Sequence, residues 1–199
     1  MRLNFRARGE QSQRTLDLDR MVVAQGVSFR VLHLLSRSAQ VMVLLGLQYN
    51  RPFHRDSAFL LLLALGPIVW ISMIEVFPFQ PLPRHTIWSP AFLSIALWQP
   101  LFEELLFRGI VQGRLLQSTA RRKTWIGLSV SNLLTSLLFS LAHLASHSVS
   151  WSLLVFVPSL CFGFVRDRFG SVHPSITLHA FYNAGYFLLL GGLTLPNSF

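Results

Sequence analysis

Apolar stretches separated by short polar connections make up most of the chain from residue 57 onward. Five of these stretches are predicted to cross a membrane as helices, and they cover residues 57–77, 87–107 and beyond, 125–146, 149–165 and 172–192. Most hold about 20 residues, which is enough to cross a hydrocarbon core about 30 Å thick. The fourth is shorter and contains Pro158, so we expect it to be kinked or to span only partly. The pattern predicts an all-α fold, a polytopic transmembrane helical bundle of about five spans.

The first 56 residues follow a different pattern. Residues 1–20 are polar and have no apolar core, which predicts a polar N-terminal tail and not a signal peptide. Residues 22–47 are apolar, but small and polar residues recur along one stripe of a helix, and these are Gly26, Arg30, His33, Arg37 and Gln40. Arginines facing lipid are costly, so an amphipathic helix at the membrane interface is favoured over a true span. The predicted organisation is a tail (1–20), an amphipathic helix with a linker (21–56) and a transmembrane domain (57–199).

Arginine and lysine lie on alternate connections between the predicted spans. They precede the first strong span and follow the second and the fourth, and they are Arg51, Arg55, Arg114, Arg121, Arg122, Lys123, Arg166 and Arg168. The intervening connections hold Arg84 alone and then none. Because cytoplasmic connections are rich in Lys and Arg, this alternation predicts a cytoplasmic N-terminus and a C-terminus on the other side. A full span over residues 22–47 would place the arginine-rich tail outside, which further favours the interfacial helix.

The composition agrees with a bilayer environment. Of the 199 residues, 52% are hydrophobic and 13% are charged, whereas soluble domains carry about 25% charged residues. The same values exclude a disordered chain, which requires low hydrophobicity. The net charge is +9, but the basic residues lie between apolar segments, so no nucleic-acid partner is expected. Cys161 is the single cysteine, which excludes an internal disulfide and a cysteine metal cluster.

Two adjacent carboxylates, Glu103 and Glu104, lie inside the second apolar stretch. Ionisable side chains within a span are expensive and indicate a functional site by default. Glu104 and Arg108 are four residues apart, so they share a helical face and can form an ion pair. Glu103 points about 100° away from that face, which leaves its carboxylate available for general-base chemistry. The alternative is a charge cluster at a helix end with a structural role.

Two further motifs place a pair of functional side chains four residues apart on later stretches, an aromatic ring with an imidazole in one and an imidazole with a carboxamide in the other. Phe139 precedes His143 by one helical turn, and His179 precedes Asn183 in the same way. Adjacent imidazole and carboxamide groups are the donors that an oxyanion needs. The alternatives are an interfacial histidine at position 143, and interhelical hydrogen bonds at positions 179 and 183.

The depth of these residues tests whether they can meet. Glu103 lies 18 residues before the charged turn at Arg121 and His143 lies 22 residues after it, so antiparallel helices would bring both to a similar level, about 27–33 Å from the turn. His179 fits less well, because it lies only 11 residues after Arg168. The last span must therefore start deeper, tilt, or follow a re-entrant turn.

The ordered set of motifs resembles the CPBP/Abi family of intramembrane glutamic endopeptidases, which includes the Ras-converting CAAX prenyl protease. That family has an EExxxR motif, then FxxxH, then HxxxN or HxxxB, on successive helices. The chain has Glu103, Glu104 and Arg108 in the first motif, and the other two motifs are those at 139–143 and 179–183. The resemblance covers residues 88–192.

The resemblance implies a metal-independent protease that needs no cofactor. Glu103 would activate a water held with His143, and His179 and Asn183 would stabilise the tetrahedral oxyanion. The supporting residues that orient and buffer the site would be Glu104, Arg108 and Phe139. The sequence contains no HExxH motif, so a zinc site of that type is unsupported.

The implied substrate is a membrane-anchored or lipidated protein or peptide that enters from the bilayer. C-terminal trimming, peptide maturation and removal of a C-terminal sorting tag all remain open, as does the oligomeric state. The expected location is the bacterial cytoplasmic (inner) membrane. The rival interpretation is a non-enzymatic scaffold or bacteriocin-immunity protein that keeps the same fold. A transporter is a weaker alternative, because no inverted repeat is evident.

Overall fold

The computed structural model describes residues 38–49, 52–75, 81–118, 124–125 and 127–190. The chain divides into two compact units, residues 1–41 and 42–199, and the description below concerns the second. The predicted tail and most of the predicted amphipathic helix lie outside the described residues. Residues 38–45, at the end of that predicted helix, are helical.

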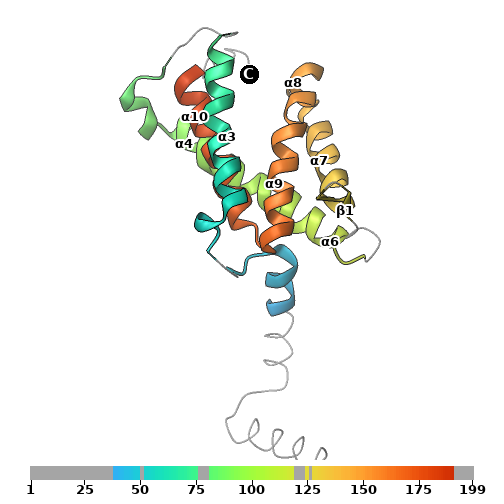
Figure 1. Ribbon diagram of the computed structural model, residues 1–199. Coiled ribbons are helices and arrows are strands. Elements are labelled where there is room, and N and C mark those ends of the chain that lie inside the picture. Colours follow the sequence, from blue (N-terminus) through green and yellow to red (C-terminus); the bar gives the residue numbers. More distant parts are fainter. Residues whose placement is uncertain (1–37, 50–51, 76–80, 119–123, 126, 191–199) are drawn as a thin grey trace, which may run out of the picture. The chain divides into compact units, whose positions relative to one another are not determined.

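The described part of the second unit is almost entirely helical, so the predicted all-α class is confirmed (Figure 1). Its elements are η1 (Phe53–Arg55), α3 (Ser57–Ile74), η2 (Arg84–Trp88), α4 (Pro90–Leu93), η3 (Ser94–Trp98), α5 (Gln99–Glu104), η4 (Leu105–Gln112), α6 (Gly113–Leu115), a hairpin of β1 (Thr124–Trp125) and β2 (Leu128–Ser129), α7 (Val130–His143), α8 (Val149–Leu154), α9 (Phe156–Phe169) and α10 (His173–Leu190).

Two helical stretches among the described residues are long and apolar enough to cross a membrane. They are Ser57–Ile74 and Val149–Phe169, and the second contains both α8 and α9. Helix α7 is apolar but shorter. The predicted number of about five spans therefore stays a prediction.

One continuous helical stretch runs from α4 to α6. It begins at Ser89, whose hydroxyl accepts a hydrogen bond from the N–H of Phe92. Two of its segments, η3 and η4, are π-helical, which is a geometry often found at functional sites. Pro100 follows η3 and has no N–H to give to the carbonyl of Ala96, so the α-helical hydrogen-bond pattern is interrupted there. The stretch crosses the bundle obliquely: its first half packs on α10, and its second half packs on α7 and α9 (Figure 1).

The later helices begin and end where local backbone chemistry dictates. Helix α7 starts at residue 130, five residues later than expected, because Gly127 makes a turn at φ 78° and the Ser129 hydroxyl caps the N–H of Asn132. The kink expected from Pro158 is present as a break at Val155 between α8 and α9. Pro158 cannot donate to the carbonyl four residues before it, so the break falls one turn earlier.

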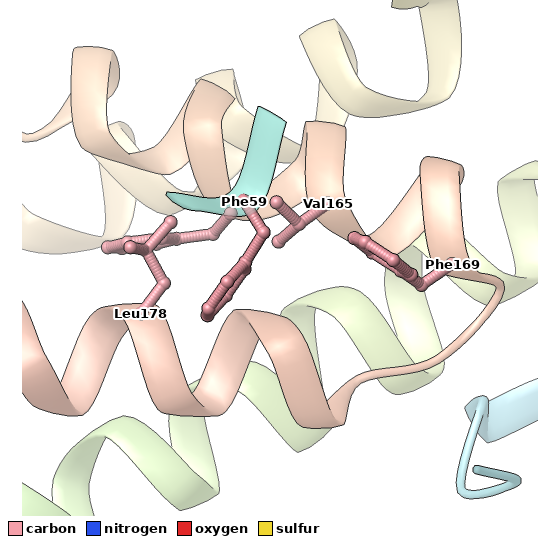
Figure 2. Packing of buried hydrophobic residues seen from close by; sticks show 5 residues of the cluster. Phe59, Val165, Phe169 and Leu178 are labelled. Atoms are coloured by element: carbon pink, nitrogen blue, oxygen red, sulfur yellow. The ribbon is translucent and has the colours of Figure 1, made fainter. Parts of the chain in front are cut away.

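Helix α9 occupies the centre of the unit, with α7 and α10 packed against it and α3 packed on α10. Figure 2 shows the apolar cluster that joins α3, α9 and α10. Its buried members are Phe59, Phe162, Val165, Phe169 and Leu178. The small size of Gly163 allows α7 to approach α9, because a Cβ there would lie 1.8 Å from Oδ1 of Asn132.

Polar side chains join several helices at one end of the unit, which we call the Asp167 end. Asp167 accepts hydrogen bonds from Nε2 of Gln112 (2.7 Å) and from Oγ of Ser129 (2.5 Å), so the end of η4, the start of α7 and the end of α9 meet there. Arg168 donates two 2.9 Å hydrogen bonds to Asp56, the residue that caps α3.

The Arg168 guanidinium, together with the N–H groups of Phe59 and Ala58, holds the pKa of Asp56 below its ordinary value. This pair therefore stabilises the fold above the pKa of the unfolded carboxyl, and its contribution is lost as the pH falls through the folded pKa.

Substitution of Gly163 tests the close approach of α7 and α9. Alanine in a helix is normally favoured over glycine by up to about 1 kcal/mol, but Gly163→Ala is expected to lower the free energy of unfolding by about 1–3 kcal/mol through overpacking. The matched control is Gly109→Ala, whose added Cβ would meet its nearest neighbour, the carbonyl of Leu45, at an ordinary 3.4 Å. The measurement is denaturant unfolding in detergent micelles. Equal stability of the two variants would contradict the predicted clash.

Candidate active site

Glu104 and Arg108 form an ion pair in the interior, as the four-residue spacing predicts. Nε of Arg108 lies 3.2 Å from Oε2 of Glu104, and both side chains are 0% exposed. Nη2 of Arg108 also donates to the carbonyl and hydroxyl oxygens of Ser159 on α9, both at 2.6 Å. The rings of Phe139 and Phe162 lie 4.9 and 5.6 Å from the guanidinium carbon. Hydrogen bonds and cation–π contacts of this kind offset the cost of removing two charges from water.

The imidazole of His179 lies between the two glutamates. Its Nδ1 is 2.9 Å from Oε1 of Glu104, and its Nε2 is 3.7 Å from Oε2 of Glu103. The ring is stacked on Phe162 at a centroid distance of 4.5 Å and an interplanar angle of 16°. Because Glu104 is paired with Arg108 as a carboxylate, it accepts the hydrogen bond and Nδ1 of His179 donates it.

Glu103 is the more accessible of the two glutamates, since its side chain is 21% exposed. One oxygen, Oε1, accepts a 2.9 Å hydrogen bond from Nε2 of Gln99, one helical turn earlier. The other, Oε2, faces His179. Gln99 was not predicted as a site residue, although its position four residues before Glu103 could have indicated the contact.

His143 lies at the last residue of α7 and is joined to the rest of the site by Phe139. Nδ1 of His143 donates to the carbonyl oxygen of Phe139 at 2.9 Å, which leaves Nε2 of the neutral ring as an acceptor. The Phe139 ring lies 4.5 Å from the His143 ring and 6.0 Å from the His179 ring, measured between centroids. Phe139 therefore contacts both histidines and the guanidinium of Arg108.

Asn183 follows His179 by one turn of α10 and contacts the oblique stretch. Its Nδ2 donates a 3.1 Å hydrogen bond to the carbonyl of Ile95 in the π-helical segment η3. This is an interhelical hydrogen bond, as the alternative interpretation of this residue expected. It uses one N–H of the amide, and a second N–H of the same group remains for another acceptor.

The hydrogen bonds at the Asp167 end determine how far along the helical bundle His179 lies. Gln112 lies eight residues after Glu104, at the end of the π-helical segment η4, and it is bonded to Asp167 at the end of α9. The following helix starts at His173, after a left-handed Gly170 and a hydrogen bond from Val172 N–H to the carbonyl of Gly46. Six residues later, about 9 Å along α10, is His179. The end of α9 is thus level with Gln112, which lies nine residues before Arg121, the residue from which the depths were counted.

Among the residues that the structure describes, no group of three or more His, Cys, Asp and Glu side chains is arranged to hold a metal ion. Glu103, Glu104 and His179 are close together, but Glu104 is engaged by Arg108, and His179 directs Nδ1 at that same carboxylate.

Comparison with known protein families assigns the chain to one of them. Residues 85–185, about half of the chain, match the model of a family described as type II CAAX prenyl endopeptidase Rce1-like. The chain belongs to this Rce1-like family. Comparisons with curated proteins and with solved structures gave no significant match.

Membership of the Rce1-like family makes the chain a membrane protease, a hydrolase of peptide bonds, and it does not favour the non-enzymatic interpretation. The predicted family is therefore confirmed. The matched region contains all seven predicted site residues, which are Glu103, Glu104, Arg108, Phe139, His143, His179 and Asn183.

A double-mutant cycle tests the buried ion pair of this Rce1-like chain. Arg108→Met and Glu104→Gln are each expected to cost about 3–5 kcal/mol in the free energy of unfolding, because each leaves a partner charge buried and alone. The double variant should cost clearly less than the sum, since no lone charge remains. Chemical denaturation in micelles gives the three values. Additive costs would show that the two charges do not stabilise one another.

Proposed function

We propose that the chain is an integral membrane endopeptidase in which Glu103 activates a water molecule for attack on a peptide bond. The observation that carries this proposal is the unequal environment of the two glutamates. Arg108 neutralises Glu104, whereas Glu103 is partly exposed and keeps no arginine partner among its described contacts. A base must accept the proton of water as the nucleophile forms, and a carboxylate held by Gln99 suits this role. His143 would hold the same water through its free Nε2.

His179 and Asn183 are proposed to stabilise the oxyanion that forms on the substrate carbonyl. A proton on Nε2 of His179 and the second N–H of Asn183 are the donors that remain after their contacts with Glu104 and Ile95. The new negative charge on the substrate carbonyl oxygen would then form beside these two donors.

The proposed substrate is a protein or peptide held in the bilayer by an apolar anchor or a lipid. Exposed apolar side chains follow the oblique stretch directly beside Glu103, and they are Trp98, Phe102, Leu106 and Ile110. An apolar face of this kind suits contact with lipid and with a substrate that arrives laterally. C-terminal trimming, peptide maturation and removal of a sorting tag are all compatible with this route.

The remaining parts of the proposal concern the whole chain. We infer a multi-pass protein of about five spans in a cytoplasmic membrane, with the protease domain over residues 57–199 and a polar tail and interfacial helix before it. The N-terminus is proposed to be cytoplasmic because the basic connections alternate with the neutral ones.

Glu103→Gln and His143→Ala are expected to reduce cleavage by about 10²–10⁴-fold, because each removes one partner of the attacking water. The measurement is quantitative proteomics of membrane-protein C-termini in cells that produce each variant. Glu75→Gln is the matched control, since Glu75 is an exposed glutamate at the end of α3. Full cleavage by both site variants would leave the polar residues with a structural role only.

Independence of the reaction from metal ions is tested on the purified enzyme. The substrate is a membrane-anchored protein identified by the proteomics of C-termini. Dialysis against a strong chelator should leave the cleavage rate unchanged, because carboxylate and imidazole groups supply the proposed base and donors. Loss of activity that returns on addition of Zn²⁺ or another divalent ion would replace the glutamic mechanism with a metal-assisted one.

A further inference from the structure

Arg166 is a buried arginine near the end of α9, and it is 4% exposed. Its Nε donates a 3.1 Å hydrogen bond to the backbone carbonyl of Arg108, the residue whose side chain pairs with Glu104. Its Nη2 donates a 3.2 Å hydrogen bond to the backbone carbonyl of Leu44. One guanidinium therefore connects the oblique stretch, which carries both glutamates, to a segment at the start of the unit.

Three residues on one face of α9 hold the oblique stretch. Ser159, Gly163 and Arg166 follow one another at intervals of four and three residues, so they share that face. The Arg108 side chain donates to Ser159, and the Arg108 backbone carbonyl accepts from Arg166. Between these two contacts along α9, the carbonyl of Gly163 accepts a 3.0 Å hydrogen bond from Nε2 of Gln112. Helix α9 therefore holds Arg108 by its backbone as well as by its side chain.

The Leu44 carbonyl belongs to the last turn of the helical residues 38–45. The last four carbonyls of a helix have no partner within that helix. The carbonyls of the two residues before Leu44 accept hydrogen bonds from the N–H groups of Gly46 and Leu47. Gly46 has a φ of 66°, which is common for a glycine after a helix, and a Cβ there would lie 2.6 Å from Cζ of Arg166. By donating to the Leu44 carbonyl, Arg166 satisfies the third of these four carbonyls.

The same helix end lies directly on the oblique stretch. Gly109 and Gly113 are four residues apart, so they share one helical face. A Cβ at Gly113 would clash with the carbonyl oxygen of Leu44, and a Cβ at Gly109 would lie 3.4 Å from the carbonyl oxygen of Leu45. Gly109 directly follows Arg108 in the chain. The backbone that carries the buried ion pair is therefore supported by this helix end.

We propose that Arg166 is a positioning residue for the reaction. It holds the peptide unit of Arg108, and the Arg108 guanidinium orients Glu104. Glu104 in turn accepts a hydrogen bond from Nδ1 of His179. This inference rests on the proposed function for the role of His179, whereas the contacts of Arg166 are independent of it. Because the effect reaches the substrate only through a group that stabilises the transition state, loss of Arg166 slows the chemical step and leaves substrate binding unchanged.

Arg166→Met, Arg166→Lys and Arg168→Met test the proposal on purified enzyme in detergent micelles. The substrate is a membrane-anchored protein identified by the proteomics of C-termini, and size-exclusion chromatography selects folded enzyme. Arg166→Met should lower kcat by about 10–100-fold and leave KM within about twofold, because a small displacement of a reacting group costs rate. Arg166→Lys should recover part of this loss, since its ammonium still donates hydrogen bonds. Arg168→Met, the matched control, removes the exposed pair with Asp56 and should keep kcat.

Three results of this experiment would overturn the proposal. The first is a wild-type kcat in Arg166→Met. The second is an equal fall of kcat in Arg168→Met, which would show general destabilisation of the end of α9. The third is a rise in KM without a fall in kcat, which would show an effect on substrate binding alone.

Gly46→Ala disturbs the same contact without removing a buried charge, so it tests the proposal even if Arg166→Met does not fold. The added Cβ would press on the Arg166 guanidinium. Gly127→Ala is the matched control, because Gly127 also has a positive φ, 78°, but the described residues other than its chain neighbours leave no atom within 4 Å of an added Cβ. Both variants should lose stability through backbone conformation, but only Gly46→Ala should lower kcat. Equal kcat values in the two variants would overturn the proposal.

Hydrogen exchange measured by mass spectrometry follows the contacts of Arg166 without any cleavage assay. Arg166→Met should speed the exchange of backbone N–H groups in residues 42–47 and 105–113, because both segments lose a hydrogen bond to the guanidinium. Arg168→Met should leave the exchange of both segments unchanged. Unchanged exchange of both segments in Arg166→Met would overturn the proposal.

Glu103→Gln in the same cleavage assay separates the positioning role from the proposed reaction. Loss of cleavage in Glu103→Gln together with full kcat in Arg166→Met would refute the positioning role alone. Full cleavage by Glu103→Gln together with a lowered kcat in Arg166→Met would refute Glu103 as the base and support the positioning role.

Discussion

The buried ion pair between Glu104 and Arg108 is the interaction on which the site depends. Neither charge reaches solvent, and a single charge left at that depth would cost several kcal/mol. Arg108 is held from other helices by the oxygens of Ser159 and by the rings of Phe139 and Phe162. The contacts of one guanidinium therefore join η4, α7 and α9.

The same pair makes the two neighbouring glutamates chemically different. Glu104 uses one oxygen for Arg108 and the other for His179, so both of its oxygens are engaged in structure. Glu103 is held by Gln99 and His179 but remains partly exposed. In the proposed reaction, Glu104 orients His179 and the more accessible Glu103 activates water. Both glutamates lie within residues 85–185, which match the protease family.

The Asp167 end sets the depth of the site. Asp167 joins Gln112 and Ser129, and these contacts align one end of three helices. The contacts at that end therefore bring Glu104 on the oblique stretch and His179 on α10 to the same level, where the two side chains are hydrogen-bonded.

Residue spacing by itself determined which side chains share a helical face, since the twist of a helix is a property of the backbone. It therefore predicted the pairing of Glu104 with Arg108, the all-α class and the protease family. Helix limits were predicted less well, because the Ser129 cap and the hydrogen bond that Pro158 cannot make act within a single turn. Only the tertiary structure decided that His179 lies between the two glutamates. That contact joins residues 75 positions apart and depends on where α9 ends against η4, which no local pattern specifies.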